Sequence, residues 1–222
     1  MVISAMRLKA REPGSAITHF IGFVAAVIGL PIILIHSAAR GDGVPGTVAS
    51  IVFMLSMIAL YGASTTYHTF DVNDRVNMIL KKIDHMMVFV LIAGSYAPAC
   101  LLVFDKQTGT RMLAAVWIVA IAGMIFKYCW VTCPKWVSSV IYIAMGWMIV
   151  PAIPKFLIAS EPGAFAWTLA GGILYSIGGV MYAFKFDVFR GRFKNFGTHE
   201  LFHVFVLAGS LCHFIAVYFF ML

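Results

Sequence analysis

Residues 17–39, ITHFIGFVAAVIGLPIILIHSAA, decide the class of fold. The stretch contains no Asp, Glu, Lys or Arg, and about 20 apolar residues of helix cross a bilayer core of about 30 Å. It has no period-two alternation, so it is typical of a transmembrane helix rather than of a barrel strand. It is also too long for the core of a signal peptide, and no small-residue cleavage site follows it. We therefore interpret it as a retained helix.

Six further stretches have the same length and apolar character, give or take a few residues at each end. They are residues 47–68, 83–104, 112–130, 136–154, 164–184 and 199–222. The sequence thus predicts an all-α membrane protein, a seven-transmembrane helix bundle. We expect residues 17–222 to form one domain, preceded by a short cytoplasmic N-terminal segment at 1–16.

Small and kinking residues lie inside these stretches. Pro31, Pro98, Pro151 and Pro154 predict kinks. Gly171, Gly172, Gly178 and Gly179 give the sixth predicted helix a small face for close packing.

The composition agrees with lipid as the solvent. Of 222 residues, 62% are hydrophobic and 11% are charged, and the mean hydropathy is +0.94. A chain with so little charge cannot cover a water-facing surface of its own size. The net charge of +7 is scattered over loops, which indicates basic loops beside an anionic inner leaflet and not a nucleic-acid partner. We expect a multi-pass protein of the cell membrane.

Lysine and arginine predict the orientation of the bundle. Twelve lie on the N-terminal side of the membrane: Arg7, Lys9, Arg11, Arg75, Lys81, Lys82, Lys127, Lys135, Lys185, Arg190, Arg192 and Lys194. Four lie on the other side: Arg40, Lys106, Arg111 and Lys155. The connecting loops are short, and short cytoplasmic loops carry the excess of basic residues. The N-terminus is therefore predicted to be cytoplasmic and the C-terminus to be outside.

Ionisable residues gather at the predicted cytoplasmic ends of the helices. They are His19, His68, Asp84, His85, His199, Glu200 and His203, whereas His36 and His213 lie towards the other side. Ionisable groups are expensive inside a membrane, so each of them is a candidate functional residue.

A metal site is the function that this pattern favours. His199 and His203 are four residues apart and share one helix face, and His68 supplies a third imidazole from another helix. Three protein ligands with an open fourth position are typical of a catalytic zinc site. Asp84 can orient a ligand or hold a water molecule there. Ser64 is one turn before His68. The alternatives are histidines that only sit at the membrane interface and a Ser64 hydroxyl that bonds to its own helix.

Residues 199–203, HELFH, also match the H-E-x-x-H pattern of metalloproteases. An intramembrane protease would need a further acidic ligand on another span. Asp84 is the only candidate within a predicted span, and no domain that admits a peptide accompanies it. The sequence therefore disfavours a protease.

The whole chain resembles the bacterial hemolysin III family, part of the superfamily of the progestin and adiponectin receptors. The stretches that carry the resemblance are THFIG at 18–22, STTYH at 64–68, KIDH at 82–85, AGSYAP at 93–98, MGW at 145–147, HELFH at 199–203 and GSLCHF at 209–214. They follow one another in family order over all seven predicted spans, which is more specific than any single motif.

The resemblance implies a seven-helix fold whose topology is inverted relative to G-protein-coupled receptors. It implies Zn²⁺ held by His68, His199 and His203, with Asp84 holding the water at the zinc and Ser64 in the same set. The adiponectin-receptor relatives and the similar alkaline ceramidases are linked to hydrolysis of ceramide-like amides. Bacterial members are tied to membrane fluidity, and the family name comes from haemolytic, pore-forming activity.

Three hypotheses follow. The first is a zinc-dependent hydrolase of a ceramide-like or N-acyl membrane lipid at the inner leaflet, with Asp84 as general base and Ser64 at the oxyanion. The second is a non-enzymatic sensor of membrane fluidity in which zinc clamps helices. The third is a pore-forming cytolysin, which an apolar bundle without a polar helix face disfavours. The substrate and the oligomeric state stay open.

Overall fold

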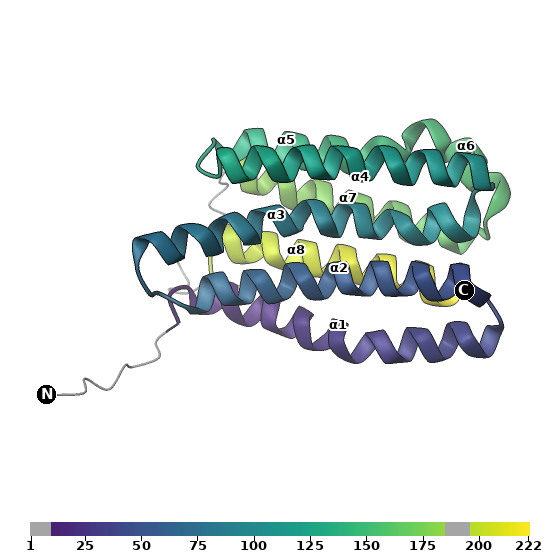
Figure 1. Cartoon of the computed structure of the whole chain (residues 1–222), viewed down its shortest axis with the longest axis horizontal. Coiled ribbons are helices and arrows are strands. Elements are labelled where there is room, and N and C mark those ends of the chain that lie inside the picture. Colours follow the sequence, from purple (N-terminus) through teal and green to yellow (C-terminus); the bar gives the residue numbers. More distant parts are fainter. Residues whose placement is uncertain (1–9, 185–195) are drawn as a thin grey trace, which may run out of the picture.

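Each of the seven predicted stretches forms a helix in the computed structural model, which describes residues 10–184 and 196–222. The elements are α1 (Pro13–Arg40), α2 (Gly43–Thr69), α3 (Asp74–Pro98), η1 (Ala99–Val103), α4 (Lys106–Cys129), α5 (Lys135–Gly146), η2 (Trp147–Ala152), α6 (Ile153–Ala159), α7 (Pro162–Phe184) and α8 (Thr198–Phe220). The helices run alongside one another as a bundle (Figure 1).

Seven helical segments are long and apolar enough to cross a membrane. The third consists of α3 and η1, and the fifth of α5, η2 and α6. Large apolar side chains such as Ile35 and Ile158 point outward, where they are 70% and 87% exposed. An outer surface of this kind suits lipid, so the chain is a multi-pass, all-α membrane protein.

The helices form a closed ring in chain order. Each long helix packs on the next, α5 and α7 are neighbours, and α8 closes the ring against α1. One buried cluster lies around Phe89, Met145 and Phe156 on the α3, α5 and α6 side. A second lies around Phe53 and Tyr61 between α1, α2 and α8. The ring leaves a central space that the inner faces of the helices line.

Of the four prolines expected to kink helices, three lie where the helix type changes. Pro98 ends α3 before the π-helical turn η1, Pro151 lies in the 3₁₀ segment η2, and Pro154 lies in the first turn of α6. The helix α1 continues through Pro31. These changes agree with the missing N–H of proline, which interrupts the α-helical ladder.

The start of α1 and the end of α8 lie at opposite ends of the bundle (Figure 1). Arg11, Arg75 and Lys135 lie at or beside the helix ends on the N-terminal side, as the orientation argument requires. Arg7, Lys9, Lys185, Arg190, Arg192 and Lys194 fall outside the described residues. The assignment of this end to the cytoplasm is a prediction from the basic residues.

Lys127, which was counted among the basic residues of the N-terminal side, is not exposed in a loop. It is buried in the last turn of α4, where its Nζ donates to Ser138 Oγ at 2.5 Å and to Cys133 Sγ at 3.2 Å. A buried ammonium without such partners would be costly, so this contact ties α4 to α5.

Candidate metal centre

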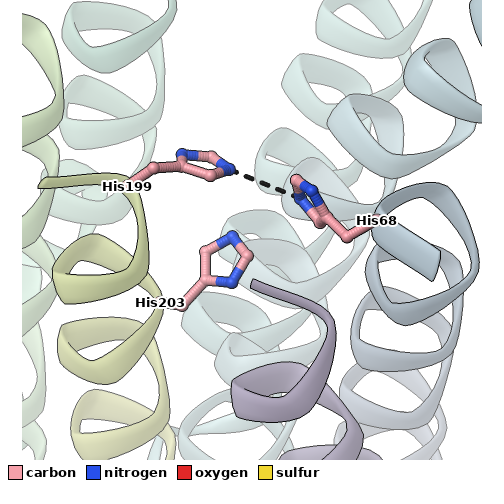
Figure 2. A group of neighbouring side chains, drawn as sticks. All are labelled: His68, His199 and His203. Atoms are coloured by element: carbon pink, nitrogen blue, oxygen red, sulfur yellow. Dashed lines mark hydrogen bonds between the residues drawn. The ribbon is translucent and has the colours of Figure 1, made fainter. Parts of the chain in front are cut away.

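Three imidazoles meet at the N-terminal end of the bundle. His68 comes from the last turn of α2, and His199 and His203 come from the first turns of α8 (Figure 2). One ring nitrogen from each lies within 4.8 Å of the other two, and the Nε2 atoms of His68 and His199 are 3.4 Å apart. The ends of two helices that are distant in sequence therefore bring these side chains together. The three histidines can hold a metal ion.

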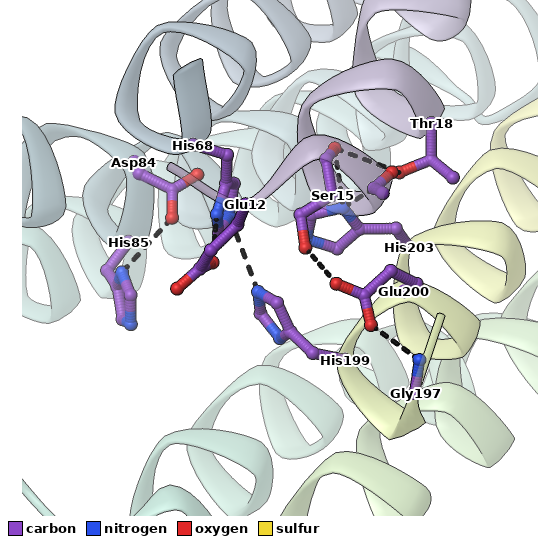
Figure 3. Close-up of polar contacts among 11 residues, drawn as sticks. Glu12, Ser15, Thr18, His68, Asp84, His85, Gly197, His199, Glu200 and His203 are labelled. Atoms are coloured by element: carbon purple, nitrogen blue, oxygen red, sulfur yellow. Dashed lines mark hydrogen bonds and ion pairs between the residues drawn. The ribbon is translucent and has the colours of Figure 1, made fainter. Parts of the chain in front are cut away.

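The ring nitrogen of His68 that does not face His199, Nδ1, lies beside a carboxylate. Its Nδ1 is 2.6 Å from Glu12 Oε2, and the His68 side chain is buried (Figure 3). This hydrogen bond lowers the pKa of the Glu12 carboxyl below its usual 4.5. Glu12 is therefore ionised at neutral pH and accepts the Nδ1–H, which leaves the Nε2 lone pair free for a ligand bond.

The Nδ1 nitrogen of His203 also has hydrogen-bond partners. Its Nδ1 lies 3.3 Å from the carbonyl oxygen of Ser15 and 3.1 Å from Thr18 Oγ1. A carbonyl oxygen only accepts, so Nδ1 carries the proton and Nε2 is free. In both buried histidines Nε2 is therefore the nitrogen that can bind a metal. Such second contacts are typical of metal-ligating imidazoles.

The spacing of His68 and His199 fits zinc. Zinc–nitrogen bonds of 2.0–2.1 Å in a tetrahedron place two ligand nitrogens about 3.4 Å apart. The two facing Nε2 atoms have this separation. Two nitrogen lone pairs at this distance repel each other unless a proton or a cation lies between them. The donor set of three imidazoles is one that zinc accepts.

Asp84 and Ser64 lie beside the cluster. Asp84 is buried in the first half of α3, with its Oδ2 3.3 Å from Nδ1 of His85. The Ser64 hydroxyl is buried and has no hydrogen-bond partner among the described residues. The alternative in which it bonds to its own helix is thus absent here. Both side chains line the same cavity as His199 and His203.

His19 is a fourth imidazole at the site. The sequence indicated it as a candidate functional residue but predicted no role for it in the metal site. Its ring stacks on His203 with centroids 3.6 Å apart, and both ring nitrogens are buried without a partner in the described part of the chain. Its position near a predicted span end was the available signal. Glu12 was missed, because it lies before the first apolar stretch and far from His68 in sequence.

Glu200 has another role than that of a protease base. Its Oε1 accepts from the Ser15 hydroxyl at 2.5 Å, and its Oε2 accepts from the backbone N–H of Gly197 at 2.8 Å (Figure 3). These bonds hold the start of α8 against α1. The H-E-x-x-H pattern therefore supplies two imidazoles that could hold a metal ion and a carboxylate with structural hydrogen bonds.

A cavity of about 160 Å³ extends from the histidines into the bundle. At its polar end it is lined by His19, Ser64, Asp84, His199 and His203. Further along, the lining is mainly apolar and includes Phe156, Phe165 and Met221. The cavity thus combines a few polar side chains beside the histidines with a mainly apolar remainder, a lining that suits an amphiphilic ligand.

Comparisons with known proteins find relatives over almost the whole chain. A sequence model of proteins described as haemolysin-III related matches residues 8–214. The chain is 35% identical over 211 residues to "Hemolysin-3" of Bacillus cereus, covering 95% of this chain and 92% of that protein. It is 36% identical over 210 residues to "Hemolysin-3 homolog" of Bacillus subtilis (strain 168), with 94% and 93% covered. The adiponectin receptor protein of Drosophila melanogaster is 23% identical over 219 residues, which are 91% of this chain and 49% of that protein.

Proposed function

The chain belongs to the haemolysin-III related family, and from that premise we propose that it is a zinc-dependent hydrolase of an amide bond in a membrane lipid. The observation that carries the proposal is the position of Asp84 and Ser64. Both are buried in the cavity that the imidazoles of His199 and His203 line. We infer a ceramide-like or N-acyl lipid that enters from the cytoplasmic leaflet.

His68, His199 and His203 would hold the zinc ion, with Glu12, Ser15 and Thr18 fixing two of the rings. A bound zinc ion lowers the pKa of water and polarises a carbonyl group, which is the chemistry that amide hydrolysis needs. The carboxylate of Glu12 would keep the ring of His68 in place as a ligand.

Asp84 would act as the general base. It takes one proton from the attacking water, whose oxygen forms the new bond to the acyl carbon. When the carbon–nitrogen bond breaks, that proton passes to the leaving amine, so the products are a fatty acid and an amine. The unpartnered Ser64 hydroxyl would donate to the carbonyl oxygen as negative charge develops there. The apolar part of the cavity would hold the acyl chain.

A second candidate is a sensor in which the metal only clamps helices. The observation in its favour is the set of bonds from α1 to the metal site. Glu12 contacts His68 on α2, and Ser15 contacts both Glu200 and His203 on α8. A metal ion there would join α2 to α8, and the α1 region contacts both helices at the site, so a change in lipid packing that shifts α1 would alter the geometry of the ligands.

Asp84→Asn separates the two functions. The substitution keeps size and hydrogen bonding but removes the base, and the three histidines remain. If the protein is a hydrolase, release of fatty acid from a labelled ceramide falls by about 10²–10⁴-fold, while zinc content and thermal stability are retained. His203→Ala should lose both zinc and activity. Asp74→Asn, at the exposed start of the same helix, is the matched control and should behave like the parent.

One outcome would contradict the hydrolase proposal. Suppose Asp84→Asn keeps its zinc and restores full function to cells that lack the gene, and the parent releases no fatty acid from ceramide. The hydrolase proposal then fails and the sensor remains.

A further inference from the structure

A second group of polar side chains lies deeper in the bundle, away from the metal site. Tyr61 of α2 donates its hydroxyl to Ser210 Oγ of α8 at 2.5 Å, and Tyr175 Oη of α7 is 2.8 Å from the same oxygen. The ring of His213 stacks on that of Tyr175, with centroids 5.4 Å apart and an angle of 19° between the planes. We call Tyr175, Ser210 and His213, with Tyr61 behind them, the inner polar group.

The hydrogen bonds of this group leave one hydroxyl hydrogen without an acceptor. The three hydroxyls carry three hydrogens. Tyr61 uses its hydrogen on Ser210, and the contact between Ser210 and Tyr175 uses one more, whichever of the two donates. One O–H, on Tyr175 or on Ser210, has no partner within the group. An unused donor in an apolar interior is unfavourable by itself.

Two members of the inner polar group, Tyr175 and His213, line the cavity that begins at the metal site. Thr168, two turns before Tyr175 on α7, lines the same cavity, and its buried hydroxyl has no partner among the described residues. The side chains around them, such as Leu169 and Val217, are apolar. Polar groups therefore interrupt the apolar lining in this part of the cavity.

The depth of this section follows from helix geometry. His213 is ten residues after His203 on α8, which is about 15 Å along the axis at 1.5 Å per residue. An extended chain advances about 3.5 Å for every three bonds, so about a dozen bonds reach from the metal site to His213. That depth is about half of a 30 Å bilayer core.

We propose that Tyr175 and His213 form a subsite for a hydroxyl group carried near the middle of the substrate's acyl chain, with the unpartnered Thr168 hydroxyl two turns away in the same cavity. A hydroxyl accepts the unused O–H and donates to a ring nitrogen or an oxygen, so it satisfies both kinds of group. A plain chain would leave them unpaired, and a carboxylate at mid-membrane depth is too costly. The inference rests on the proposed function, because that function places the acyl chain of a substrate in this cavity.

Binding of free fatty acids tests the subsite without hydrolysis. The purified full chain in detergent is given a labelled octadecanoic acid, and three unlabelled acids compete with it. We expect 12-hydroxyoctadecanoic acid to bind about tenfold more tightly than octadecanoic acid, a gain typical of an added buried hydrogen bond. The 2-hydroxy acid should show no such gain, because its hydroxyl lies near the metal site. Equal affinities of the 12-hydroxy and plain acids would overturn the proposal, as would an equal gain for the 2-hydroxy acid.

Two single-site variants assign the effect to residues. Tyr175→Phe removes one hydroxyl, and His213→Phe keeps an aromatic ring on Tyr175 while removing both ring nitrogens. Each should abolish most of the preference for the 12-hydroxy acid and keep the zinc content of the parent. The matched control is His36→Phe, because His36 stacks on Tyr218 and lies outside the described lining of the cavity. Preference retained in both Tyr175→Phe and His213→Phe would refute the subsite.

The results also separate this proposal from the hydrolase. A 12-hydroxy preference in a protein that releases no fatty acid from any amide would leave the subsite standing and remove the hydrolase. Hydrolysis of hydroxylated and plain N-acyl chains at equal rates, with equal binding of the two acids, would do the reverse.

Discussion

At the residue scale, Glu12 is the side chain that most changes the chemistry of the metal centre. It lies just before Pro13, the first residue of α1, and its carboxylate reaches His68 on α2. Because the carboxylate fixes the proton on Nδ1, it decides which nitrogen of His68 is available to a metal. A carboxylate that holds a ligand imidazole in this way also increases its basicity.

Glu12→Gln should therefore weaken zinc binding by about 10–100-fold, the usual cost of losing such a partner. The glutamine amide keeps a similar size but loses the negative charge that holds His68. Competition with a coloured zinc chelator measures the affinity. Glu161→Gln, an exposed carboxylate at the other end of the bundle, is the control and should leave the affinity unchanged. Equal zinc affinity in both variants would show that Glu12 does not support the metal.

The residues of the site differ in how far the sequence predicts them. His199 and His203 share one helix face by their spacing alone, and the geometry confirms that His68 joins them. The contact of Glu12 with His68 and the stack of His19 on His203 depend on how α1 leans against α2 and α8. Helical periodicity contains no information about such contacts between helices, so only the folded chain shows them.

At the element scale, the glycines of α7 decide how closely that helix meets its neighbours. A Cβ at Gly171 would lie 2.6 Å from His213 and 3.0 Å from the carbonyl oxygen of Gly209 on α8. A Cβ at Gly178 would lie 2.8 Å from Phe205, whereas one at Gly172 would meet nothing within 4 Å. The predicted small face is thus divided, because Gly171 and Gly178 face α8 and Gly172 faces the cavity.

Gly171→Ala should destabilise the bundle by about 1–3 kcal/mol, because overpacking against a backbone carbonyl forces the helices apart. Gly172→Ala is the matched control. It should be neutral or stabilise by up to about 1 kcal/mol, since alanine favours the helix and the space is open. Thermal or denaturant-induced unfolding in detergent compares the two. If both variants unfold alike, α7 and α8 do not pack as closely as described.

Apolar length predicts the existence of the helices well and their ends less well. The third span was expected to begin at residue 83, but α3 begins at Asp74. The additional turns contain Asp74, Arg75, Lys81 and Lys82. Hydropathy detects only the part of a helix that is suited to lipid, so a polar extension beyond the membrane is invisible to it. The cap that starts it, Asn73 accepting from the N–H of Val76, is a local signal that apolar periodicity does not include.

At the scale of the whole molecule, the ring of helices brings the starts of the first and last helices, α1 and α8, together at one site. The start of α8 closes against α1, so residues near positions 12–19 meet residues 197–203. The chain order of the seven spans could be predicted from apolar length, but the closure of the ring could not. Closure of the ring places the cavity between the imidazoles of His199 and His203 and the inner face of α3.

The orientation of the ring decides on which side of the membrane the metal centre works, and it gives the last prediction. The basic residues favour the cytoplasm for the end that holds the three histidines. Seven spans then place Leu222 outside, at the opposite end from the start of α1 (Figure 1). Alkaline phosphatase needs an oxidising compartment for its disulfides, so a fusion after Leu222 should be active. A fusion after Val72, in the connection between α2 and α3, should be inactive. A fluorescent protein that matures only in the cytoplasm should give the reverse pattern at the two positions. Activity of the phosphatase after Val72 and not after Leu222 would turn the bundle over and place the metal centre, with any hydrolysis there, at the outer leaflet.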